Sequence, residues 1–172
     1  MDVFPLADVR YTYRSDFDQR RHKGVDLFAP RGTPVLAVSA GKAEAKIDPK
    51  GGKVVYLTGD DGRRWYYAHL DQWEAPPLRF GAAVPVAAGD LLGSVGNTGN
   101  AKGTRPHLHF QMWDPKVGLV DPYHVLREID PHTDSDLPDL EVTPVPKKRK
   151  TNGNLGIALL ALIGLWAMRK KR

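Results

Sequence analysis

The sequence of 172 residues contains no cysteine. This absence excludes a disulfide framework, a thiol nucleophile, an iron–sulfur cluster and a zinc site built on thiolates. Histidine and carboxylate side chains are then the strongest metal ligands that the chain offers. The cellular compartment stays open, because a chain without cysteine can fold inside or outside the cell.

The charged residues are unevenly distributed along the chain. Residues 1–127 carry 17 basic and 14 acidic side chains, residues 128–146 carry six acidic and no basic ones, and residues 147–172 carry eight basic and no acidic ones. The formal net charge of +5 is therefore mostly a property of the C-terminal end. The body lacks a dense stripe of lysine and arginine with interleaved aromatic residues, so the sequence predicts no nucleic-acid partner.

Residues 1–127 also lack any window in which apolar residues recur with the period of a helix. Short apolar runs rich in β-branched residues alternate there with turn signals such as Pro30-Arg31-Gly32 and Asn97-Thr98-Gly99. This pattern predicts a mainly β domain over residues 1–127, with one short helix near Pro122–Arg127. The predicted strands are Val25–Phe28, Val35–Val38, Val54–Thr58, Trp65–His69, Leu91–Val95 and His107–Trp113.

The rest of the chain predicts a linker and an apolar helix. Residues 128–154 are rich in acidic residues and proline, which oppose a packed core, and they end in the basic cluster Lys147–Lys150. The apolar run 155–168 predicts a helix about 21 Å long, against a hydrocarbon core of about 30 Å. With the basic end 169–172, we expect residues 155–172 to associate with an anionic lipid membrane, by spanning it or by partial insertion. A docking helix for another protein is the alternative.

Three motifs that contain histidine carry candidate chemistry. In His22-Lys23-Gly24-Val25-Asp26, an imidazole and a carboxylate lie four residues apart, and the glycine favours a turn into a strand. In His107-Leu108-His109, a strand directs both imidazoles to one face and the leucine to the other. In Tyr67-Ala68-His69-Leu70, a histidine closes a strand. Taken singly, a surface ion pair, solvent-facing histidines and a structural histidine explain these motifs at least as well as a functional site.

Taken together, the motifs fit a catalytic zinc site. Such a site needs three protein ligands and an open fourth position for water. His22, Asp26 and one of the pair His107 and His109 supply that set. Two histidines then remain to move protons, because an imidazole titrates near neutral pH.

The order and spacing of the motifs resemble the M23 zinc peptidases, the peptidoglycan endopeptidases of the LytM and lysostaphin type. His22–Asp26 fits the family's H-x-G-x-D element, Tyr67–Leu70 fits Y-x-H-L, and His107–His109 fits the H-L-H signature. Further matching elements are Gly32-Thr33-Pro34-Val35, Ala88-Gly89-Asp90, Thr98-Gly99 and Asp121-Pro122. The resemblance covers roughly residues 18–127.

The resemblance implies an antiparallel β-sheet groove that takes extended peptides, and one zinc ion per chain. His22, Asp26 and His109 would bind the zinc. His107 would act as general base or orient the water, and His69 would stabilise the polarised carbonyl or the tetrahedral intermediate. The implied reaction is hydrolysis of the peptide cross-links of bacterial peptidoglycan, so the stem or cross-bridge peptide would be the partner.

Two residues are candidates for substrate binding. Tyr67 belongs to the Y-x-H-L element. Arg105 replaces the small residue that is frequent before Pro-His-Leu-His in the family, and its guanidinium suits a substrate carboxylate. A solvated loop charge is the alternative for Arg105.

The sequence also departs from the family pattern. Members commonly carry an F-G-x-R element before the first histidine, whereas this chain has Asp18 after Phe17. The short stretch that follows predicts a reduced wall of the groove. His124 and His132 match no motif; we expect His124 to pack or to support the site, and His132 to lie in the linker.

Two other functions stay open. A degenerate M23-like domain would bind the wall or activate other hydrolases without catalysis, although such relatives typically lose metal ligands that are all present here. Gly41 and the stretch Gly89–Gly93 are compatible with a biotinyl or lipoyl carrier domain, but no lysine lies at a clear hairpin tip.

The expected location follows from the two ends of the chain. Met1–Arg10 contains no apolar segment, so no N-terminal signal peptide is expected. A phage lysis enzyme or virion-associated enzyme, held on the virion membrane or host envelope by residues 155–172, would reconcile a missing export signal with a membrane tail. The alternative is a bacterial protein whose assigned start omits a signal.

Overall fold

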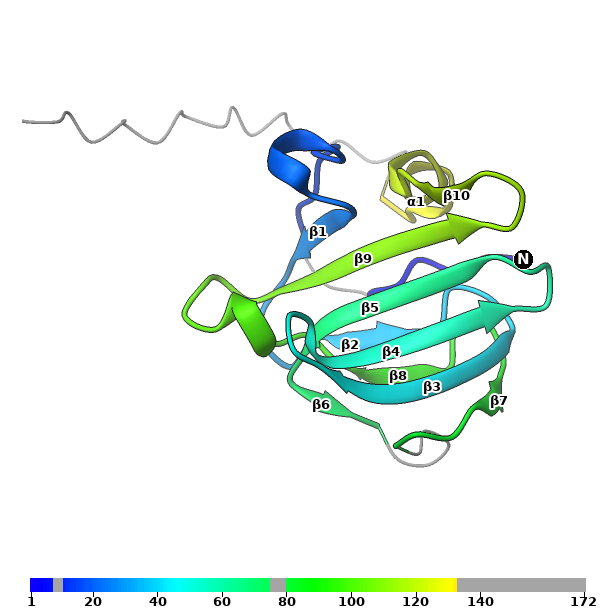
Figure 1. Ribbon diagram of the computed structural model, residues 1–172, viewed down its shortest axis with the longest axis horizontal. Coiled ribbons are helices and arrows are strands. Elements are labelled where there is room, and N and C mark those ends of the chain that lie inside the picture. Colours follow the sequence, from blue (N-terminus) through cyan, green and yellow to red (C-terminus); the bar gives the residue numbers. More distant parts are fainter. Residues whose placement is uncertain (8–10, 75–79, 133–172) are drawn as a thin grey trace, which may run out of the picture. The chain divides into compact units, whose positions relative to one another are not determined.

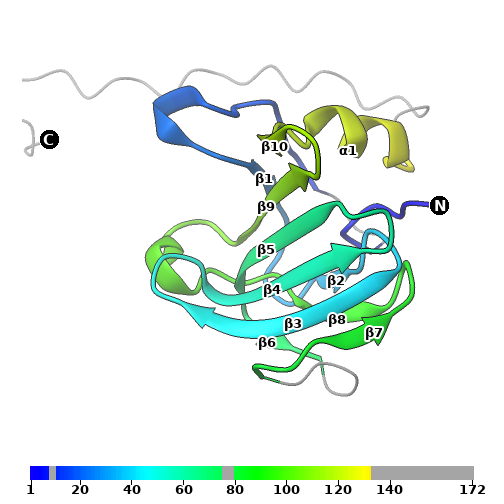
Figure 2. The same ribbon diagram turned by 45° about the vertical axis from the view of Figure 1, so that its right-hand side comes forward.

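The computed structural model describes residues 1–7, 11–74 and 80–132. Figures 1 and 2 show this part as two β-sheets joined by short loops, with short helical segments at their edges. The apolar helix predicted at 155–168 and most of the linker predicted at 128–154 lie outside the described residues. No helix in the described part is both long enough and apolar enough to cross a membrane.

The larger sheet has seven strands in the order β1-β9-β5-β4-β3-β7, with β10 also paired to β9. Figure 1 shows β1, β9, β5, β4 and β3 side by side. Every neighbouring pair is antiparallel, which confirms the predicted mainly β, antiparallel fold. The strands are β1 (Val25–Phe28), β3 (Gly41–Asp48), β4 (Gly52–Gly59), β5 (Arg64–Leu70), β7 (Val84–Val86), β9 (His107–Asp114) and β10 (Gly118–Val120).

A second, three-stranded sheet has the order β2-β8-β6. Its strands are β2 (Pro34–Leu36), β8 (Leu91–Ser94) and β6 (Gln72–Trp73), and the helical segments are η1 (Gln19–Arg21), η2 (Gly99–Ala101) and α1 (Tyr123–Ile129). Val35 and Leu92 of the small sheet share one buried cluster with Leu57 and Leu108 of the large sheet. The main core therefore lies between the sheets, and the other side of the larger sheet is left for the site.

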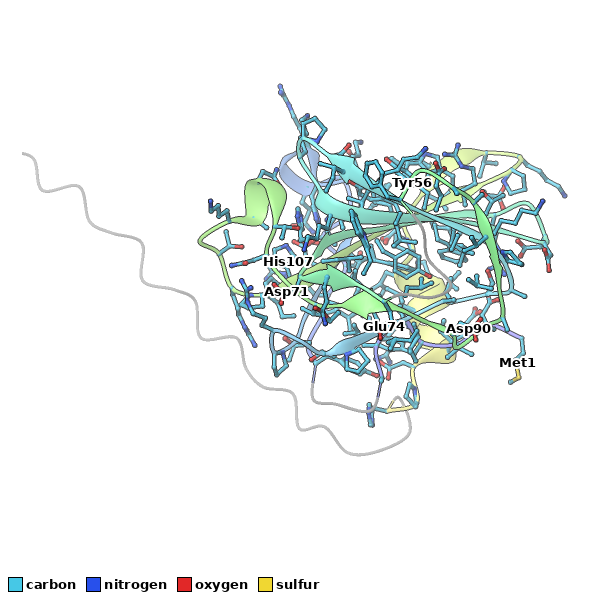
Figure 3. All side chains as sticks on the ribbon, turned by 90° about the horizontal axis from the view of Figure 1, so that it is seen from below. Met1, Tyr56, Asp71, Glu74, Asp90 and His107 are labelled. Carbon is cyan, nitrogen blue, oxygen red and sulfur yellow. The ribbon has the colours of Figure 1, made fainter. Side chains whose placement is uncertain are left out.

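Alternation along the strands separates the two sides of the larger sheet. In β9, Leu108, Phe110 and Met112 are buried in the core, so His109 and Gln111 point to the opposite side. We call this opposite side the outer face. It is defined by His109, Gln111 and Trp113 of β9, Tyr66 and Ala68 of β5, and Val54 and Tyr56 of β4. Figure 3 shows Tyr56 on this side and Asp90 on the side of the smaller sheet.

Six of the observed strands match the six predicted ones, with ends that differ by at most two residues. Strand β3 is not predicted, because its buried positions Ala43 and Ala45 are small residues with low β propensity between lysines and a glutamate. Strands β6, β7 and β10 have only two or three residues each, which is too short for a period to show.

Helix α1 starts one residue later than predicted and runs to Ile129, past the predicted boundary at residue 127. Leu126 is fully buried on its inner side. Beyond the helix, Asp130 accepts hydrogen bonds from the hydroxyls of Tyr11 and Tyr13. These contacts attach residue 130 to the domain.

We predict that Tyr67→Phe destabilises the fold by about 1–3 kcal/mol, because the buried N–H of Val38 donates to the Tyr67 hydroxyl at 2.9 Å and would lose its acceptor. Urea unfolding of the full chain measures the effect. Tyr56→Phe is the matched control, since Tyr56 is only half-buried on the outer face, and it should change the unfolding free energy by less than about 0.5 kcal/mol. Equal stabilities of the two variants would contradict the assignment.

Candidate functional site

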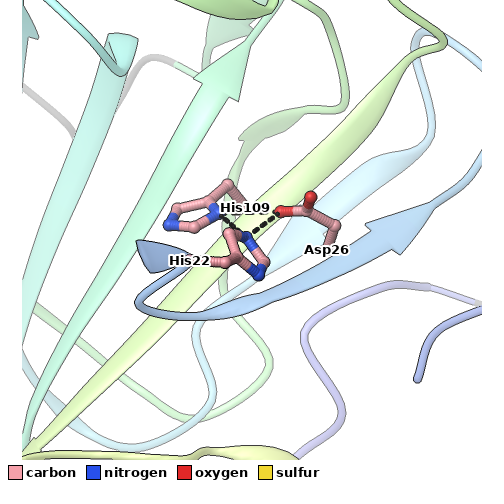
Figure 4. Close-up of side chains that lie close together, drawn as sticks. All are labelled: His22, Asp26 and His109. Atoms are coloured by element: carbon pink, nitrogen blue, oxygen red, sulfur yellow. Dashed lines mark hydrogen bonds and ion pairs between the residues drawn. The ribbon is translucent and has the colours of Figure 1, made fainter. Parts of the chain in front are cut away.

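Three side chains converge at one end of the outer face. Strand β1 runs antiparallel to β9 with Asp26 opposite His109, and His22 follows the η1 turn three residues before β1 begins. His22 Nε2 lies 3.0 Å from Asp26 Oδ1 and 3.0 Å from His109 Nδ1, and His109 Nδ1 lies 2.7 Å from Asp26 Oδ1. Figure 4 shows the two imidazoles and the carboxylate pointing toward one another. We call these three residues the metal group.

The donor atoms of the metal group suit a zinc ion. Two imidazole nitrogens and one carboxylate oxygen form a set of the kind that catalytic zinc sites use. Two ligands at about 2.0–2.1 Å from a tetrahedral zinc ion are themselves about 3.3 Å apart. The three separations of 2.7–3.0 Å in this group are a few tenths of an ångström shorter, so a small outward adjustment fits the ion.

Gly24 allows the chain to pass close to β9 between His22 and Asp26. A Cβ atom at this position would lie 2.5 Å from the carbonyl oxygen of Phe110 and 3.0 Å from Cε1 of His109. Steric hindrance therefore explains the glycine of the H-x-G-x-D element in this structure, since any side chain at this position would push His22 away from the other two ligands.

A second layer of polar groups orients the two imidazoles. His22 Nδ1 lies 2.9 Å from Asp16 Oδ1, so its N–H is donated to a carboxylate and its Nε2 lone pair faces the metal group. His109 Nε2 lies 2.9 Å from the amide nitrogen of Gln111. When Nδ1 of His109 is a ligand, its Nε2 carries the proton, and Gln111 accepts that proton with its side-chain amide turned by 180°, so that the oxygen takes the place of the nitrogen.

Hydrogen bonds within the metal group shift the pKa values of Asp26 and His22. Burial raises the pKa of Asp26, but hydrogen bonds from His109 and His22 outweigh burial and hold that pKa well below its usual range. The hydrogen bond to Asp26 raises the pKa of His22, although burial opposes it. A carboxylate that stays ionised beside two imidazoles attracts either protons or a metal cation.

Two further histidines lie beside the metal group. The ring centroids of His69 and His107 are 4.9 Å apart, and the ring of His69 is 5.8 Å from that of His109. His69 Nδ1 lies 2.9 Å from the Thr98 carbonyl oxygen, and His107 Nδ1 lies 2.8 Å from the Arg105 carbonyl oxygen. Since each Nδ1–H is donated to a carbonyl, the neutral form of each ring has its lone pair at Nε2.

His69 reaches the outer face through an unusual backbone conformation. Tyr67, two residues earlier on β5, points into the core, so regular alternation would direct His69 there as well. His69 instead has a φ of 65°, which is rare for a residue with a side chain. Burial, together with the neighbouring His107, lowers the pKa of His69, which therefore favours the neutral imidazole.

The substrate-binding predictions have different outcomes. The side chain of Tyr67 is fully buried and its hydroxyl accepts the Val38 N–H, so it has no surface with which to contact a peptide. The prediction for Tyr67 is wrong, because β5 directs this position to the core. Arg105 is exposed, and its guanidinium lies 5.2 Å from the ring centroid of Phe28, which is opposite His107. Its role in binding stays a prediction.

The structure also places the residues that depart from the motifs. Asp18 has a φ of 61°, a conformation that glycine adopts easily and that aspartate tolerates better than most residues. This explains how aspartate can occupy the glycine position of the F-G-x-R element. His124 is exposed on α1 and does not support the site. The ring of His132 lies 5.5 Å from that of Tyr11, so it packs on the domain and does not belong to a free linker.

The structure brings together the four histidines and the one carboxylate that the sequence singles out, whereas the sequence analysis does not predict the second layer. The alternation of side chains along a strand could have indicated Gln111, because this residue lies two positions after His109 and on the same side of β9. Asp16 has no such signal, since its approach to His22 depends on the tight turn between them.

Known proteins share this arrangement of motifs and strands. The sequence model of peptidase family M23 matches residues 20–122, which is more than half of the chain. The chain belongs to peptidase family M23. This M23 domain is 39% identical over 93 residues to lysostaphin of Staphylococcus staphylolyticus, covering 52% of this chain and 18% of lysostaphin. It is 32% identical over 142 residues to the L-Ala–D-Glu endopeptidase of Bacillus subtilis (strain 168), covering 73% of this chain and 43% of that protein.

Solved structures agree with the M23 fold. The catalytic domain of lysostaphin from Staphylococcus simulans has a TM-score of 0.54 and 36% identity, over 67% of this chain and 86% of that one. A zinc-containing peptidase from Vibrio cholerae has a TM-score of 0.53 and 26% identity, over 64% of this chain and 36% of that one. The chain spans less than half of the length of the two curated relatives.

We predict that Asp16→Asn weakens zinc binding by about tenfold, because the uncharged amide no longer holds the His22 N–H as firmly or raises the basicity of Nε2. Competition with a chromogenic chelator on the full chain measures the affinity without turnover. Asp18→Asn is the matched control, since its carboxylate pairs with Lys23 and not with His22, and it should bind zinc as the parent does. An unchanged affinity in Asp16→Asn would refute the orienting role.

A second prediction concerns His69 in the metal-free chain. Its lowered pKa means that the unfolded state binds a proton more readily than the folded state, so stability should fall as the pH drops below about 6.5. His69→Gln should remove part of this loss and flatten the dependence between pH 7 and pH 5. Thermal unfolding across that range measures the difference, and parallel curves for parent and variant would argue against a buried neutral His69.

Proposed function

We propose that the protein is a zinc-dependent endopeptidase that hydrolyses peptide cross-links of bacterial peptidoglycan. The observation that carries the proposal is the convergence of His22, Asp26 and His109 with two unligated histidines at one end of a sheet face. Membership of family M23 supports the same chemistry, as do the relatives named lysostaphin and L-Ala–D-Glu endopeptidase.

The metal group would hold one zinc ion. A bound zinc ion supplies a water of lowered pKa and polarises the scissile carbonyl. Asp26 compensates part of the positive charge, and Asp16 and Gln111 hold the two imidazoles in the orientation that keeps their ligand nitrogens directed at one point.

His107 has the geometry of the general base. Its Nδ1–H is fixed on the Arg105 carbonyl, so Nε2 can accept a proton from the attacking water and later deliver it to the leaving amine. His69 is fixed in the same way on the Thr98 carbonyl. In its neutral form, His69 offers only a lone pair at Nε2, so it can donate a hydrogen bond to a developing oxyanion only after it gains a proton.

The setting of the reaction is a separate part of the proposal. A tail at residues 155–172 that binds anionic lipid would keep the enzyme at the virion membrane or at the host envelope, as expected for a phage lysis or virion-associated enzyme. The clustering of basic residues on both sides of an apolar run supports it. Flotation of the full chain with anionic vesicles, against a chain that lacks residues 155–172, tests this part alone.

We predict that the full chain loaded with zinc releases new muropeptides from peptidoglycan of known cross-link type, and that a chelator abolishes their release. His109→Ala should lower the rate at least about a thousandfold, because a ligand is lost. His124→Ala is the matched control on exposed α1 and should cleave normally. Mass spectrometry of the products identifies the bond. Wall binding without any new product would indicate the non-catalytic alternative, and cleavage that survives in His109→Ala would rule out the metal mechanism.

A further inference from the structure

A depression lies on the outer face of the larger sheet, apart from the metal group. It has a volume of about 460 Å³, and strands β3, β4 and β5 supply most of its lining. Its charged side chains are those of Lys42, Lys46, Arg64 and Glu44, so three cations face one anion. We call this depression the cationic basin.

The single anion of the basin is already paired. Glu44 Oε2 lies 2.9 Å from Lys46 Nζ, and the same ammonium lies 5.6 Å from the ring centroid of Tyr56. Among the described residues, Lys42 and Arg64 form no such ion pair. The guanidinium of Arg64 lies 5.8 Å from the ring centroid of Trp113, a contact that leaves its N–H groups available to an anion.

The register of three strands places these two cations on either side of a hydroxyl. Lys42 is opposite Thr58 on β4, and Thr58 is opposite Arg64 on β5. Since neighbouring strands are about 4.8 Å apart, the backbones of Lys42 and Arg64 are about 10 Å apart with Thr58 midway. Two long cationic side chains that flank one hydroxyl donor match a carboxylate, which accepts two hydrogen bonds from a guanidinium and others from an ammonium and a hydroxyl.

The basin and the metal group lie on one side of the same sheet. Arg64 is opposite Trp113, which is four residues beyond His109 on β9. At about 3.4 Å per residue, this separation is about 14 Å along the strand. An extended peptide advances at most about 3.3–3.6 Å per residue, so about four peptide residues would connect the two places.

The side chains between the two places suit an extended peptide. The ring of Tyr66 is 6.4 Å from that of His109, 6.5 Å from that of Trp113 and 5.0 Å from that of Tyr56. The only acidic lining residue of the basin, Glu44, is held by Lys46. A chain that leaves the metal group along β9 therefore crosses aromatic surface before it reaches the two cations.

We propose that the cationic basin binds a carboxylate of the peptide substrate, about four residues from the scissile bond. The proposal rests on the proposed function and specifies its substrate. A peptidoglycan stem peptide, which carries free carboxylates, is selected over an uncharged oligoglycine bridge, which has none at that distance.

Binding to the metal-free full chain tests the basin without turnover. The probes are a stem tetrapeptide with free carboxylates, the same peptide with its carboxylates amidated, and a pentaglycine amide, each followed by NMR titration. We expect the free tetrapeptide to bind about tenfold tighter than the amidated one, and to shift the resonances of residues 42, 58 and 64. Raising the salt concentration should reduce that preference.

Variants assign the preference to the basin. Lys42→Gln and Arg64→Gln should each weaken binding of the free tetrapeptide about threefold to fivefold, and the double variant should bind free and amidated peptides equally. Arg127→Gln is the matched control, because Arg127 is exposed on α1 and does not line the basin. In turnover, the double variant should raise KM for carboxylate-bearing cross-linked muropeptides and leave kcat unchanged.

The outcomes separate this inference from the proposed function. Equal binding of free and amidated peptides by the parent chain would overturn the basin as a carboxylate site, even if cross-links are cleaved. Absence of cleavage together with preserved carboxylate selectivity would overturn the endopeptidase and leave the basin as a peptide site. A glycerol-phosphate polymer that shifts residues 42 and 64 while the tetrapeptide does not would also overturn the proposal, in favour of an anionic wall polymer.

Discussion

The antiparallel register of β1 on β9 is the constraint on which the whole site depends. It places Asp26 opposite His109 on the outer face, while Leu27 opposite Leu108 is fully buried on the core side. A slip of one residue would turn Asp26 into the core and Leu27 toward solvent, at the cost of both a buried charge and an exposed leucine. The hydrophobic core thus fixes the position of the metal group, although the core residues lie on the opposite side of the sheet.

Local backbone strain completes what the register begins. His69 and Asp18 both have positive φ values, which cost of the order of 1–3 kcal/mol each for residues other than glycine. At His69 the conformation is secured from two sides, because its backbone N–H donates to Gly51 and its Nδ1–H to Thr98. Because of this conformation, Tyr67 at the end of β5 is buried in the core, while His69 two residues later faces the outer face.

The parts of the site that follow a period could be predicted from the sequence, and the parts that depend on tight turns could not. The alternation in His107-Leu108-His109 correctly separates the buried leucine from the outward histidines. Alternation fails between Tyr67 and His69, which face opposite sides although they lie two residues apart. The positive φ of His69 interrupts the alternation, and the residue type does not predict such a φ. The contact between Asp16 and His22 could not be predicted for a related reason. It depends on the turn between them, in which Asp18 and Arg21 both have positive φ.

Charge is arranged along the outer face in a way that favours one placement of a peptide. The metal group and Asp16 put two carboxylates beside His109, two residues from the His107 end of β9, and these attract a cation. Arg105 lies at the His107 end of β9, over Phe28, whereas Lys42 and Arg64 lie near its other end, about 20 Å away at 3.4 Å per residue. A carboxylate-bearing peptide of about six residues can therefore reach cations at both ends. Such a peptide is held at its ends with an uncharged amide bond over the metal group, which is the bond that an endopeptidase must cut.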